Sequence, residues 1–212
     1  IAIVRAIERG LDRILDLGSE HHDDERREHR DHRVVLFGAR EDLGHQLQEH
    51  GPHLVNVKVP VVLFDLPAKE GAKNGIVTKA IDGLKKLKPA PLGVAEDAAL
   101  IQAANYEEHL ALLGECDLVI EAIAERMDWK LDLYKKIAPH VPAHAIVASN
   151  TSGLSITKLS EALPEEIKSR FCGIHFFNPP RYMALVELIP TSTTRPDILD
   201  QLETIVTTTL GK

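Results

Sequence analysis

A series of short apolar runs, separated by longer amphipathic segments, constrains the fold of this chain more than any other feature. The runs are Val34–Gly38, Val59–Asp65, Cys116–Ala122, Ala145–Ala148 and Phe171–Ile174. Buried strands of a parallel sheet are short and almost continuously apolar, and helical crossovers connect them. The chain is therefore predicted to be an α/β protein, with a doubly wound, mainly parallel sheet and helices on both faces.

Polar residues follow two of these runs directly. Ser149-Asn150-Thr151-Ser152-Gly153 follows the fourth run, and His175 follows the fifth. Both should lie just beyond the carboxyl ends of strands, where open α/β sheets place their chemistry. Glu187 stands inside another apolar run, Ala184–Ile189. A carboxylate in such surroundings needs a partner, and a histidine is the obvious candidate.

These residues suggest a proton-transfer site. His175 would act as a general base, Glu187 would orient the ring and stabilise its charged form, and Ser152 would hydrogen-bond a substrate oxygen. The alternative is purely structural, because serine and asparagine commonly cap helices. In that case Ser152 and Asn150 cap the following helix, and His175 is a core histidine with its hydrogen bonds satisfied.

The motifs SNTSG at 149–153 and HFFNPP at 175–180, with a glutamate twelve positions after the histidine, resemble the 3-hydroxyacyl-CoA dehydrogenase family. The resemblance extends from about Leu54 to the end of the chain. It implies a Rossmann-like fold, NAD as cofactor, and oxidation of an (S)-3-hydroxyacyl-CoA to a 3-ketoacyl-CoA in fatty-acid β-oxidation. Some members are stand-alone enzymes, and others are parts of multifunctional fatty-acid oxidation proteins.

The resemblance also implies roles for individual residues. The catalytic residues would be His175, Glu187 and Ser152. The cofactor-binding residues would be Gly38, Asp65, Glu125, Lys130 and Asn150, of which Glu125 and Lys130 belong to the pattern EAIAERMDWK. The residues facing an acyl-CoA substrate would be Ser152 and Asn178.

The chain begins at Ile1 and ends at Lys212, and we interpret it as the N-terminal part of a longer enzyme. The helical C-terminal domain of the family is absent from it. In the family that domain supplies acyl-binding surface, a catalytic asparagine and the homodimer contacts. We therefore expect a homodimer formed through that domain, and no activity from this chain alone.

The loop after the first strand departs from the family pattern. A G-x-G-x-x-G loop would need glycine at positions 38, 40 and 43, but the chain has Gly38, Arg40 and Leu43, with Gly44 one place late. Arg40 places a long side chain where backbone must approach a pyrophosphate. Either the first fifty residues have diverged, or the sequence contains an error there. A functional alternative is a non-catalytic Rossmann-like structural or assembly domain with a degenerate phosphate loop.

Asp65 ends the second predicted strand. A carboxylate at this position accepts hydrogen bonds from the adenosine ribose hydroxyls and repels a 2′-phosphate, which favours NAD over NADP. The alternative is an exposed aspartate that caps the next helix. Another NAD-linked hydroxyacid or sugar dehydrogenase would share this arrangement, but such an enzyme would not be expected to contain SNTSG together with HFFNPP.

Residues 1–33 are expected to lie outside the nucleotide-binding domain, which we assign to residues 34–212. Ile1–Leu17 has the spacing of an amphipathic helix. Ser19–Arg33 contains four histidines among acidic and basic residues but no pattern typical of a metal site. We therefore predict a charged linker there and no metal ligand.

Composition limits the partners and the compartment. The net charge of −7 argues against a nucleic-acid or anionic-membrane surface. Cys116 and Cys172, the two cysteines, lie in apolar runs, which indicates buried thiols in a reducing, cytoplasmic compartment. Further helices are predicted at Ala68–Leu87, Asp128–His140 and Pro196–Leu210, and Trp129, Leu133 and Ile137 of the second are expected in the core.

Overall fold

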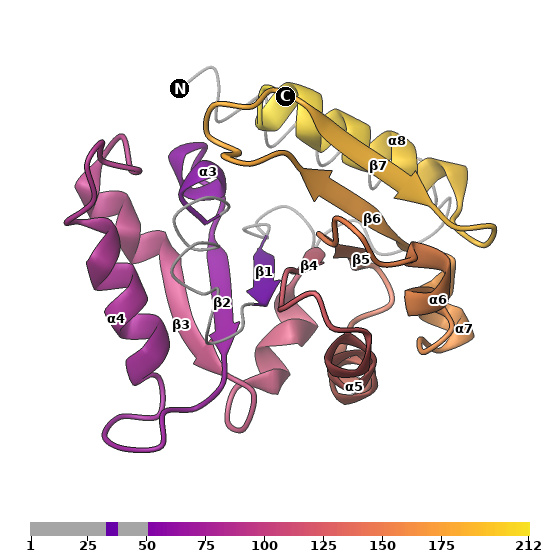
Figure 1. Cartoon of the computed structure of the whole chain (residues 1–212), viewed down its shortest axis with the longest axis horizontal. Helices are drawn as coiled ribbons and strands as arrows, with labels where there is room; N and C mark the ends of the chain where they lie inside the picture. Colours follow the sequence, from indigo (N-terminus) through magenta and orange to yellow (C-terminus); the bar gives the residue numbers. More distant parts are fainter. Residues whose placement is uncertain (1–32, 38–50) are drawn as a thin grey trace, which may run out of the picture.

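The computed structural model describes residues 33–37 and 51–212 of the chain. Within them, seven strands form one sheet in the order β3-β2-β1-β4-β5-β6-β7 (Figure 1). The strands are β1 (Val34–Phe37), β2 (Val61–Asp65), β3 (Ile101–Asn105), β4 (Leu118–Glu121), β5 (Ile146–Ser149), β6 (Phe171–Phe176) and β7 (Val186–Pro190).

Strands β1 to β6 run parallel, and β7 pairs antiparallel with β6. The strand order reverses between β1 and β4, because the chain builds outward from β1 to β3 and then returns to the other side. That reversal point is where doubly wound sheets bind nucleotides. The predicted Rossmann-like, mainly parallel α/β fold is confirmed.

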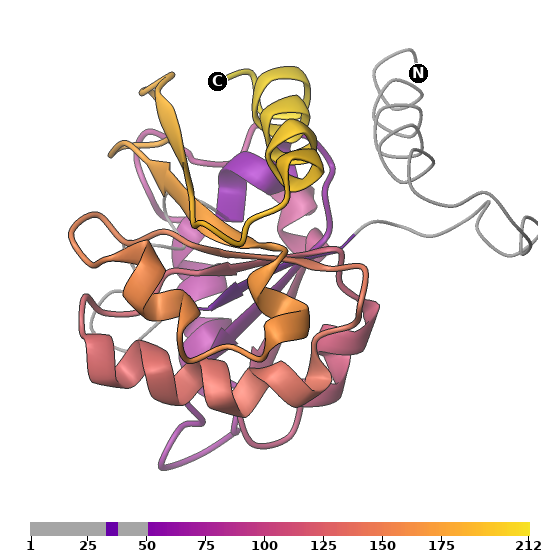
Figure 2. The same ribbon diagram turned by 90° about the vertical axis from the view of Figure 1, so that its right-hand side faces the viewer.

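The helices cover both faces of the sheet. They are α3 (Gly51–Asn56), α4 (Gly75–Leu84), α5 (Met127–Ile137), α6 (Ile156–Ser160), α7 (Glu165–Lys168) and α8 (Pro196–Thr204). Short 3₁₀ turns η2 (Ala95–Leu100), η3 (Leu110–Glu115) and η4 (Ala138–His140) and a π-helical turn, η5 (Ile205–Thr209), complete the described elements. Figure 2 shows α8 on one side of the sheet and α5, α6 and α7 on the other.

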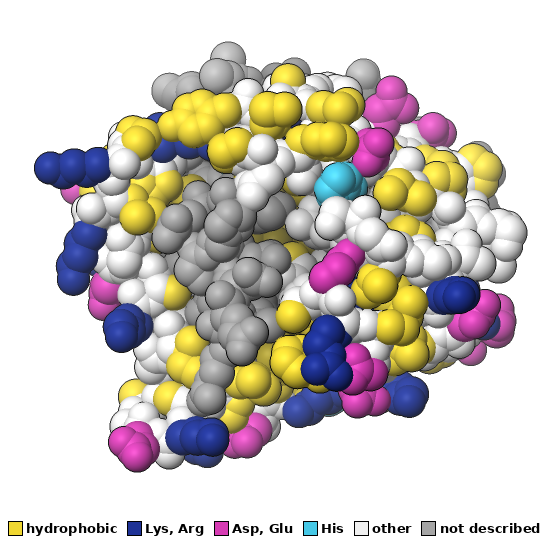
Figure 3. Space-filling model, in the orientation of Figure 1, with side chains coloured by type: hydrophobic (Ala, Val, Ile, Leu, Met, Phe, Trp, Pro, Cys, Tyr) yellow, Lys and Arg dark blue, Asp and Glu magenta, His cyan; other side chains and the backbone are white. Residues whose placement is uncertain are grey.

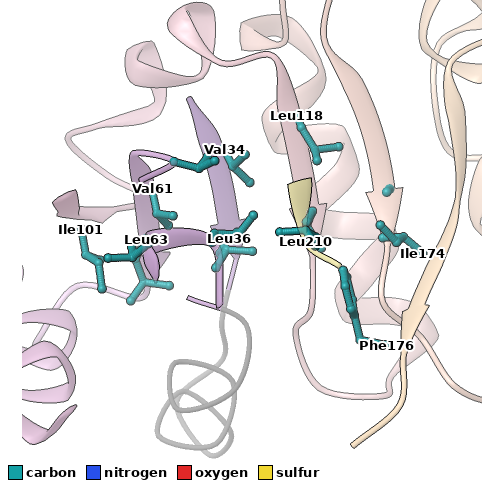
Figure 4. Packing of buried hydrophobic residues seen from close by; sticks show 14 of the residues in the cluster. Val34, Leu36, Val61, Leu63, Ile101, Leu118, Ile174, Phe176 and Leu210 are labelled. Carbon is teal, nitrogen blue, oxygen red and sulfur yellow. The ribbon is translucent and has the colours of Figure 1, made fainter. Parts of the chain in front are cut away.

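The core consists of two apolar layers, one on each face. Alternate strand residues face opposite sides, so Val34 and Leu36 join one layer while Val35 joins the other. The first layer packs under α3, α4 and α8, and Figure 4 shows some of its members. The second packs under α5, α6 and α7. Strands buried on both faces explain why the sequence shows continuous apolar runs there.

Two predicted helices are confirmed with small changes. The segment predicted at Asp128–His140 is α5 followed by η4, and the segment predicted at Pro196–Leu210 is α8 followed by η5. Both cysteines are buried, as expected. Burial raises the pKa of each thiol to about 12, so both thiols stay protonated near neutral pH.

Two expectations need correction, and one strand was not predicted. The helix predicted to begin at Ala68 begins only at Gly75, because Gly71 has a φ of +76° that a right-handed helix does not contain. Strand β3 was not predicted from its short, weakly apolar sequence. Trp129 was expected in the core but is 43% exposed, on the solvent side of α5, whereas Leu133 and Ile137 are buried.

Several predictions concern residues outside the described part of the chain. They are the amphipathic helix at Ile1–Leu17, the charged linker at Ser19–Arg33, and the phosphate loop that begins at Gly38. The domain division after residue 33 therefore stays a prediction. Among the described residues, no helix has the length and apolar character required to cross a membrane.

His53 connects α3 to the end of the described chain. Its Nε2 lies 3.1 Å from the backbone oxygen of Leu210. Burial, followed by the positive charge of Lys212, lowers the pKa of His53, and the hydrogen bond to Leu210 opposes this only in part. The folded protein therefore binds a proton at His53 less readily than the unfolded chain, whose ordinary pKa is 6.5.

We expect His53 to make stability depend on pH in a defined direction. Its contribution is fully present above pH 6.5 and is lost as the pH falls through the lower folded-state pKa. Urea unfolding at pH 7.5 and 5.5 should show a larger loss of stability in the wild type than in His53→Gln. His140→Gln, at an exposed position, should behave like the wild type. Equal losses in all three proteins would refute the assignment.

Candidate active site

His175 and Glu187 form the centre of the candidate site. They are direct partners in the antiparallel pairing of β6 and β7, and His175 Nδ1 lies 2.9 Å from Glu187 Oε2. The contact between the two side chains is the one expected from the sequence. The expected burial of Glu187 is wrong, because its side chain is 50% exposed and that of His175 is 19% exposed. The difference arises because β7 is an edge strand.

The contact determines which ring nitrogen can react. With Nδ1–H donating to the Glu187 carboxylate, the neutral ring carries its lone pair on Nε2. The ring of Phe177 packs 4.8 Å from that of His175, centroid to centroid, and limits its movement. The side chain can therefore present Nε2 as a hydrogen-bond acceptor, with Nδ1 held against the Glu187 carboxylate.

The segment 149–153 forms a turn at the carboxyl end of β5. Glu125 Oε1 accepts hydrogen bonds from the Gly153 amide at 2.7 Å, from the Ser152 amide at 3.2 Å and from the Thr151 hydroxyl at 2.5 Å. Thr151 Oγ1 in turn accepts from the amide of Leu154 at 3.1 Å. The turn is thus closed around one carboxylate oxygen, and Ser152 is left exposed on its outer side.

Glu125 is held in its charged form by these donors. Burial alone would raise its pKa, but hydrogen bonds from Thr151 and Gly153 and the positive charge of Lys130 outweigh burial, so the pKa lies below its ordinary value of 4.5. A lowered carboxyl pKa stabilises the fold above the ordinary value and loses that effect as the pH falls through the folded-state value. Glu125 therefore contributes to the stability of the turn above pH 4.5, and acidification removes that contribution.

Asn150 connects the turn to the strand that carries the histidine. Its Oδ1 accepts a hydrogen bond from the Phe176 amide at 3.0 Å, and its own amide donates to the backbone oxygen of Glu121 at 2.7 Å. The capping alternative is wrong for Ser152 and Asn150, because Ser155 is the N-cap of α6 and accepts from the Lys158 amide. Asn150 joins the ends of β4, β5 and β6.

A buried network that we did not predict lies beneath the turn. Glu121, at the end of β4, is 0% exposed. Lys130, which was predicted to line the cofactor site, is also 0% exposed, and its Nζ donates to Glu121 Oε1 at 2.6 Å. Tyr134 and Ser149 donate to the other carboxylate oxygen at 2.9 and 2.7 Å. A carboxylate within the apolar run Cys116–Ala122 was the sequence signal for this site.

The remaining predicted site residues lie on the same edge of the sheet or close to it. Asp65 ends β2, is buried, and accepts a hydrogen bond from the Leu66 amide. Asn178 is exposed in the loop after β6. Gly38 lies outside the described residues. Because parallel strands end at one edge, β2, β4, β5 and β6 bring Asp65, Glu121, the turn and His175 to a common rim.

Exposed apolar side chains flank the histidine pair. Figure 3 shows hydrophobic side chains gathered at the β6 and β7 end of the molecule. The loop between these strands contributes Tyr182, Met183 and Leu185, which are 65%, 40% and 55% exposed. Arg181 in the same loop donates a hydrogen bond to the backbone oxygen of Ala90, so the loop is anchored to the segment after α4.

Fold and site together define a class: an α/β domain of the dinucleotide-binding type, with a histidine and a carboxylate paired at the carboxyl edge of its sheet. Comparison with known families identifies the member of that class. The chain belongs to the 3-hydroxyacyl-CoA dehydrogenase family, because the description of that family's NAD-binding domain matches residues 48–212. The match begins close to Leu54, where the resemblance was expected to begin. It confirms NAD as the cofactor.

Individual relatives agree with the family. A Rickettsia felis protein, named as a trifunctional enzyme of a fatty acid oxidation complex, is 45% identical over 160 residues, covering 75% of this chain and 22% of that protein. A Bacillus subtilis protein, named as a 3-hydroxyacyl-CoA dehydrogenase, is 35% identical over 175 residues, covering 76% and 22%. The chain thus spans less than a quarter of either relative.

The fold also matches solved structures. The (S)-3-hydroxybutyryl-CoA dehydrogenase of Ralstonia eutropha superposes with a TM-score of 0.66 at 31% identity, covering 84% of this chain and 61% of that chain. The Escherichia coli 3-hydroxybutyryl-CoA dehydrogenase superposes with a TM-score of 0.69 at 26% identity, covering 85% and 37%.

Gly173, two residues before His175, gives a test of how tightly the site is packed. A Cβ atom added there would lie 2.9 Å from Ile156 Cδ1 and 3.0 Å from Ile189 Cβ. We expect Gly173→Ala to lower the unfolding free energy by about 1–3 kcal/mol, because the first residue of α6 must move away from β6.

Gly83 in α4 is a matched control, because a Cβ there meets no atom within 4 Å. Gly83→Ala should raise stability by up to about 1 kcal/mol through helix propensity. Denaturant melts of both variants measure the difference. A Gly173→Ala protein as stable as the wild type would show that β6 and α6 are not packed as described.

Proposed function

We propose that this chain forms the NAD-binding part of an enzyme that oxidises (S)-3-hydroxyacyl-CoA to 3-ketoacyl-CoA in fatty-acid β-oxidation. The observation that supports the proposal most directly is the 2.9 Å contact between His175 Nδ1 and Glu187 Oε2 at the end of β6. An alcohol can lose its proton to an imidazole held in this way, and a neighbouring nicotinamide can take the hydride.

In the proposed reaction His175 Nε2 accepts the proton of the substrate 3-hydroxyl group. Glu187 holds the ring through Nδ1 and stabilises the imidazolium that results. Ser152 lies on the exposed side of the turn that Glu125 closes, where its hydroxyl can donate to the same substrate oxygen. NAD held along this edge of the sheet would supply the acceptor for the hydride of the carbinol carbon.

The described residues suit an NAD molecule along the carboxyl edge of the sheet. Asp65 at the end of β2 would hold the adenosine ribose, where a carboxylate favours NAD over NADP. Glu125 and Asn150, at the ends of β4 and β5, would lie near the nicotinamide, and Asn178 would border the substrate side. A role for Gly38 at the pyrophosphate stays a prediction.

An acyl-CoA is the proposed substrate. The apolar loop residues Tyr182, Met183 and Leu185, exposed beside the histidine pair, offer a surface for an acyl chain. A homodimer formed through the helical domain of the family, and a cytoplasmic location, stay predictions.

Substitution of His175 tests the proposed base. His175→Ala, made in the full natural polypeptide that contains this chain, should lower turnover with a 3-hydroxyacyl-CoA and NAD by at least ~10²-fold. Binding of NADH should change little, because the proposed role is proton transfer. Steady-state kinetics and a fluorescence titration measure the two effects.

His140→Ala, at an exposed position in η4, is the matched control and should keep wild-type turnover. Near-normal turnover of His175→Ala would remove this residue from the role of base.

Binding of NADH separates the enzyme from the non-catalytic alternative. Saturable binding of NADH, followed by fluorescence or calorimetry, is expected, and Asp65→Ala should weaken it by roughly tenfold through loss of the ribose hydrogen bonds. An absence of binding would favour the structural domain with a degenerate phosphate loop.

A further inference from the structure

The loop between β6 and β7, residues 177–185, depends on outside donors for part of its backbone. It contains Pro179 and Pro180, which have no N–H group to donate. The amides of Tyr182 and Met183 both donate to the backbone oxygen of Pro179, at 2.9 and 3.0 Å. The hydrogen bonds to the backbone oxygens of Pro180 and Met183 come from another part of the chain.

Lys212 supplies these outside donors. Its Nζ donates to the backbone oxygens of Pro180 and Met183, the second at 2.9 Å. Figure 1 shows the C-terminal end of the chain beside this loop. Burial lowers the pKa of Lys212 from its ordinary value of 10.5, because the contact withdraws the ammonium group from water. One ammonium group therefore connects both ends of the turn at 180–183.

The backbone that carries Lys212 is fixed to the core. The π-helical turn η5 extends α8, and Gly211 follows with a φ of +65°, a conformation that glycine adopts without steric cost. Leu210 is buried in the first apolar layer, and its backbone oxygen lies 3.1 Å from His53 Nε2. The Lys212 amide donates to the Val206 oxygen at 3.0 Å. The loop is thus held by a rigid neighbour.

A second cation holds the loop to a different segment. Arg181 donates a hydrogen bond to the backbone oxygen of Ala90, and its guanidinium group lies 5.7 Å from the centroid of the Tyr182 ring. Arg181 belongs to the loop itself, whereas Lys212 reaches the loop from the end of α8. The loop is therefore fixed at two places, to the segment after α4 and to the segment after α8.

The restrained loop presents apolar side chains next to the histidine of the candidate site. It follows His175 closely along the chain, and Tyr182, Met183 and Leu185 are exposed on it. A binding surface on a fixed backbone avoids the entropic cost of ordering that backbone when the ligand binds. Fixing the loop should therefore favour binding of an apolar chain along it, and should matter less for proton transfer at His175.

We propose that Lys212 is a positioning residue, which fixes the β6–β7 loop and thereby raises the affinity of the site for long acyl chains. Lys212 acts through the loop backbone, by its hydrogen bonds to Pro180 and Met183. The part that concerns acyl chains rests on the proposed function, whereas the restraint of the loop by Lys212 does not.

Amide hydrogen exchange, followed by mass spectrometry of the full natural polypeptide, measures the restraint. In Lys212→Met, which keeps an apolar stem but removes the donors, a peptide that spans the loop should exchange at least ~5-fold faster than in the wild type. A reference peptide that contains Val119 in β4 should change by less than ~2-fold, because the centre of the sheet keeps its contacts. Wild-type exchange of the loop in Lys212→Met would overturn the proposal.

Two further variants separate this restraint from a general effect of losing a charge. Lys212→Arg retains several donors on a long side chain and should keep loop exchange within ~2-fold of the wild type. Lys135→Met removes an exposed lysine of α5 and should leave loop exchange unchanged. Faster loop exchange in Lys135→Met, equal to that in Lys212→Met, would contradict a specific role of Lys212.

Kinetics of the same polypeptide test the effect on substrates. Lys212→Met should raise the KM for 3-hydroxyhexadecanoyl-CoA at least ~5-fold, because the long chain lies along the loop. The KM for 3-hydroxybutyryl-CoA should change by less than ~2-fold, and kcat with either substrate should stay within ~2-fold, since the proton acceptor is unaffected.

The outcomes distinguish this proposal from the proposed function. Faster loop exchange with an unchanged KM for the long substrate would refute the role of Lys212 in chain binding. An equal rise in KM for both substrates would refute it as well. A wild-type protein without dehydrogenase activity would refute the proposed function, and loop exchange in Lys212→Met would then decide the restraint alone.

Discussion

The carboxyl edge of this sheet depends on the hydrogen bonds that the buried Glu121 carboxylate accepts. It lies opposite Ser149 in the register of β4 and β5, and its four donors fill the acceptor positions of a charge that is removed from water. An unpaired carboxylate at this depth would destabilise the fold strongly. The hydrogen bonds that stabilise the charge of Glu121 also restrain the loop carrying Glu125 and the start of the turn carrying Ser152. One set of contacts therefore serves both purposes.

The change from parallel to antiparallel pairing at β6 and β7 creates the second half of the site. In an antiparallel pair, directly opposite residues bring their side chains together on one face. His175 and Glu187 occupy such positions, and β7 therefore delivers a carboxylate to the histidine without a crossover helix. Asn150 then connects this pair to the turn, through its hydrogen bond from the Phe176 amide. His175 and the turn carrying Ser152 are thereby connected through the Asn150 side chain, which accepts from the backbone of β6.

The sequence predicted the strands that are buried on both faces, because continuous apolar runs identify them, and it predicted the contact of His175 with Glu187. Strand β3 and the start of α4 were not predicted, since an edge strand has a weak apolar pattern and Gly71 breaks the helix locally. The most informative error concerns carboxylates in apolar runs. A carboxylate inside an apolar run was expected to be buried and to need a partner. We applied this expectation to Glu187, which is half-exposed on an edge strand. It holds instead for Glu121, which is fully buried on β4, between β1 and β5. The position of each strand in the sheet determines which of the two carboxylates is buried, and the local sequence does not reveal that position.

We propose that His175, oriented by Glu187, exchanges a proton with the oxygen of a 3-hydroxyacyl-CoA beside bound NAD. A crystal structure of the full natural polypeptide with NADH and a 3-ketoacyl-CoA tests it most directly. We expect His175 Nε2 within hydrogen-bond reach, ~2.6–3.2 Å, of the substrate 3-oxygen, with Nδ1 still against Glu187 and the Ser152 hydroxyl on the same oxygen. A ternary complex with Nε2 directed away from that oxygen, or with the substrate bound at the opposite edge of the sheet, would contradict it.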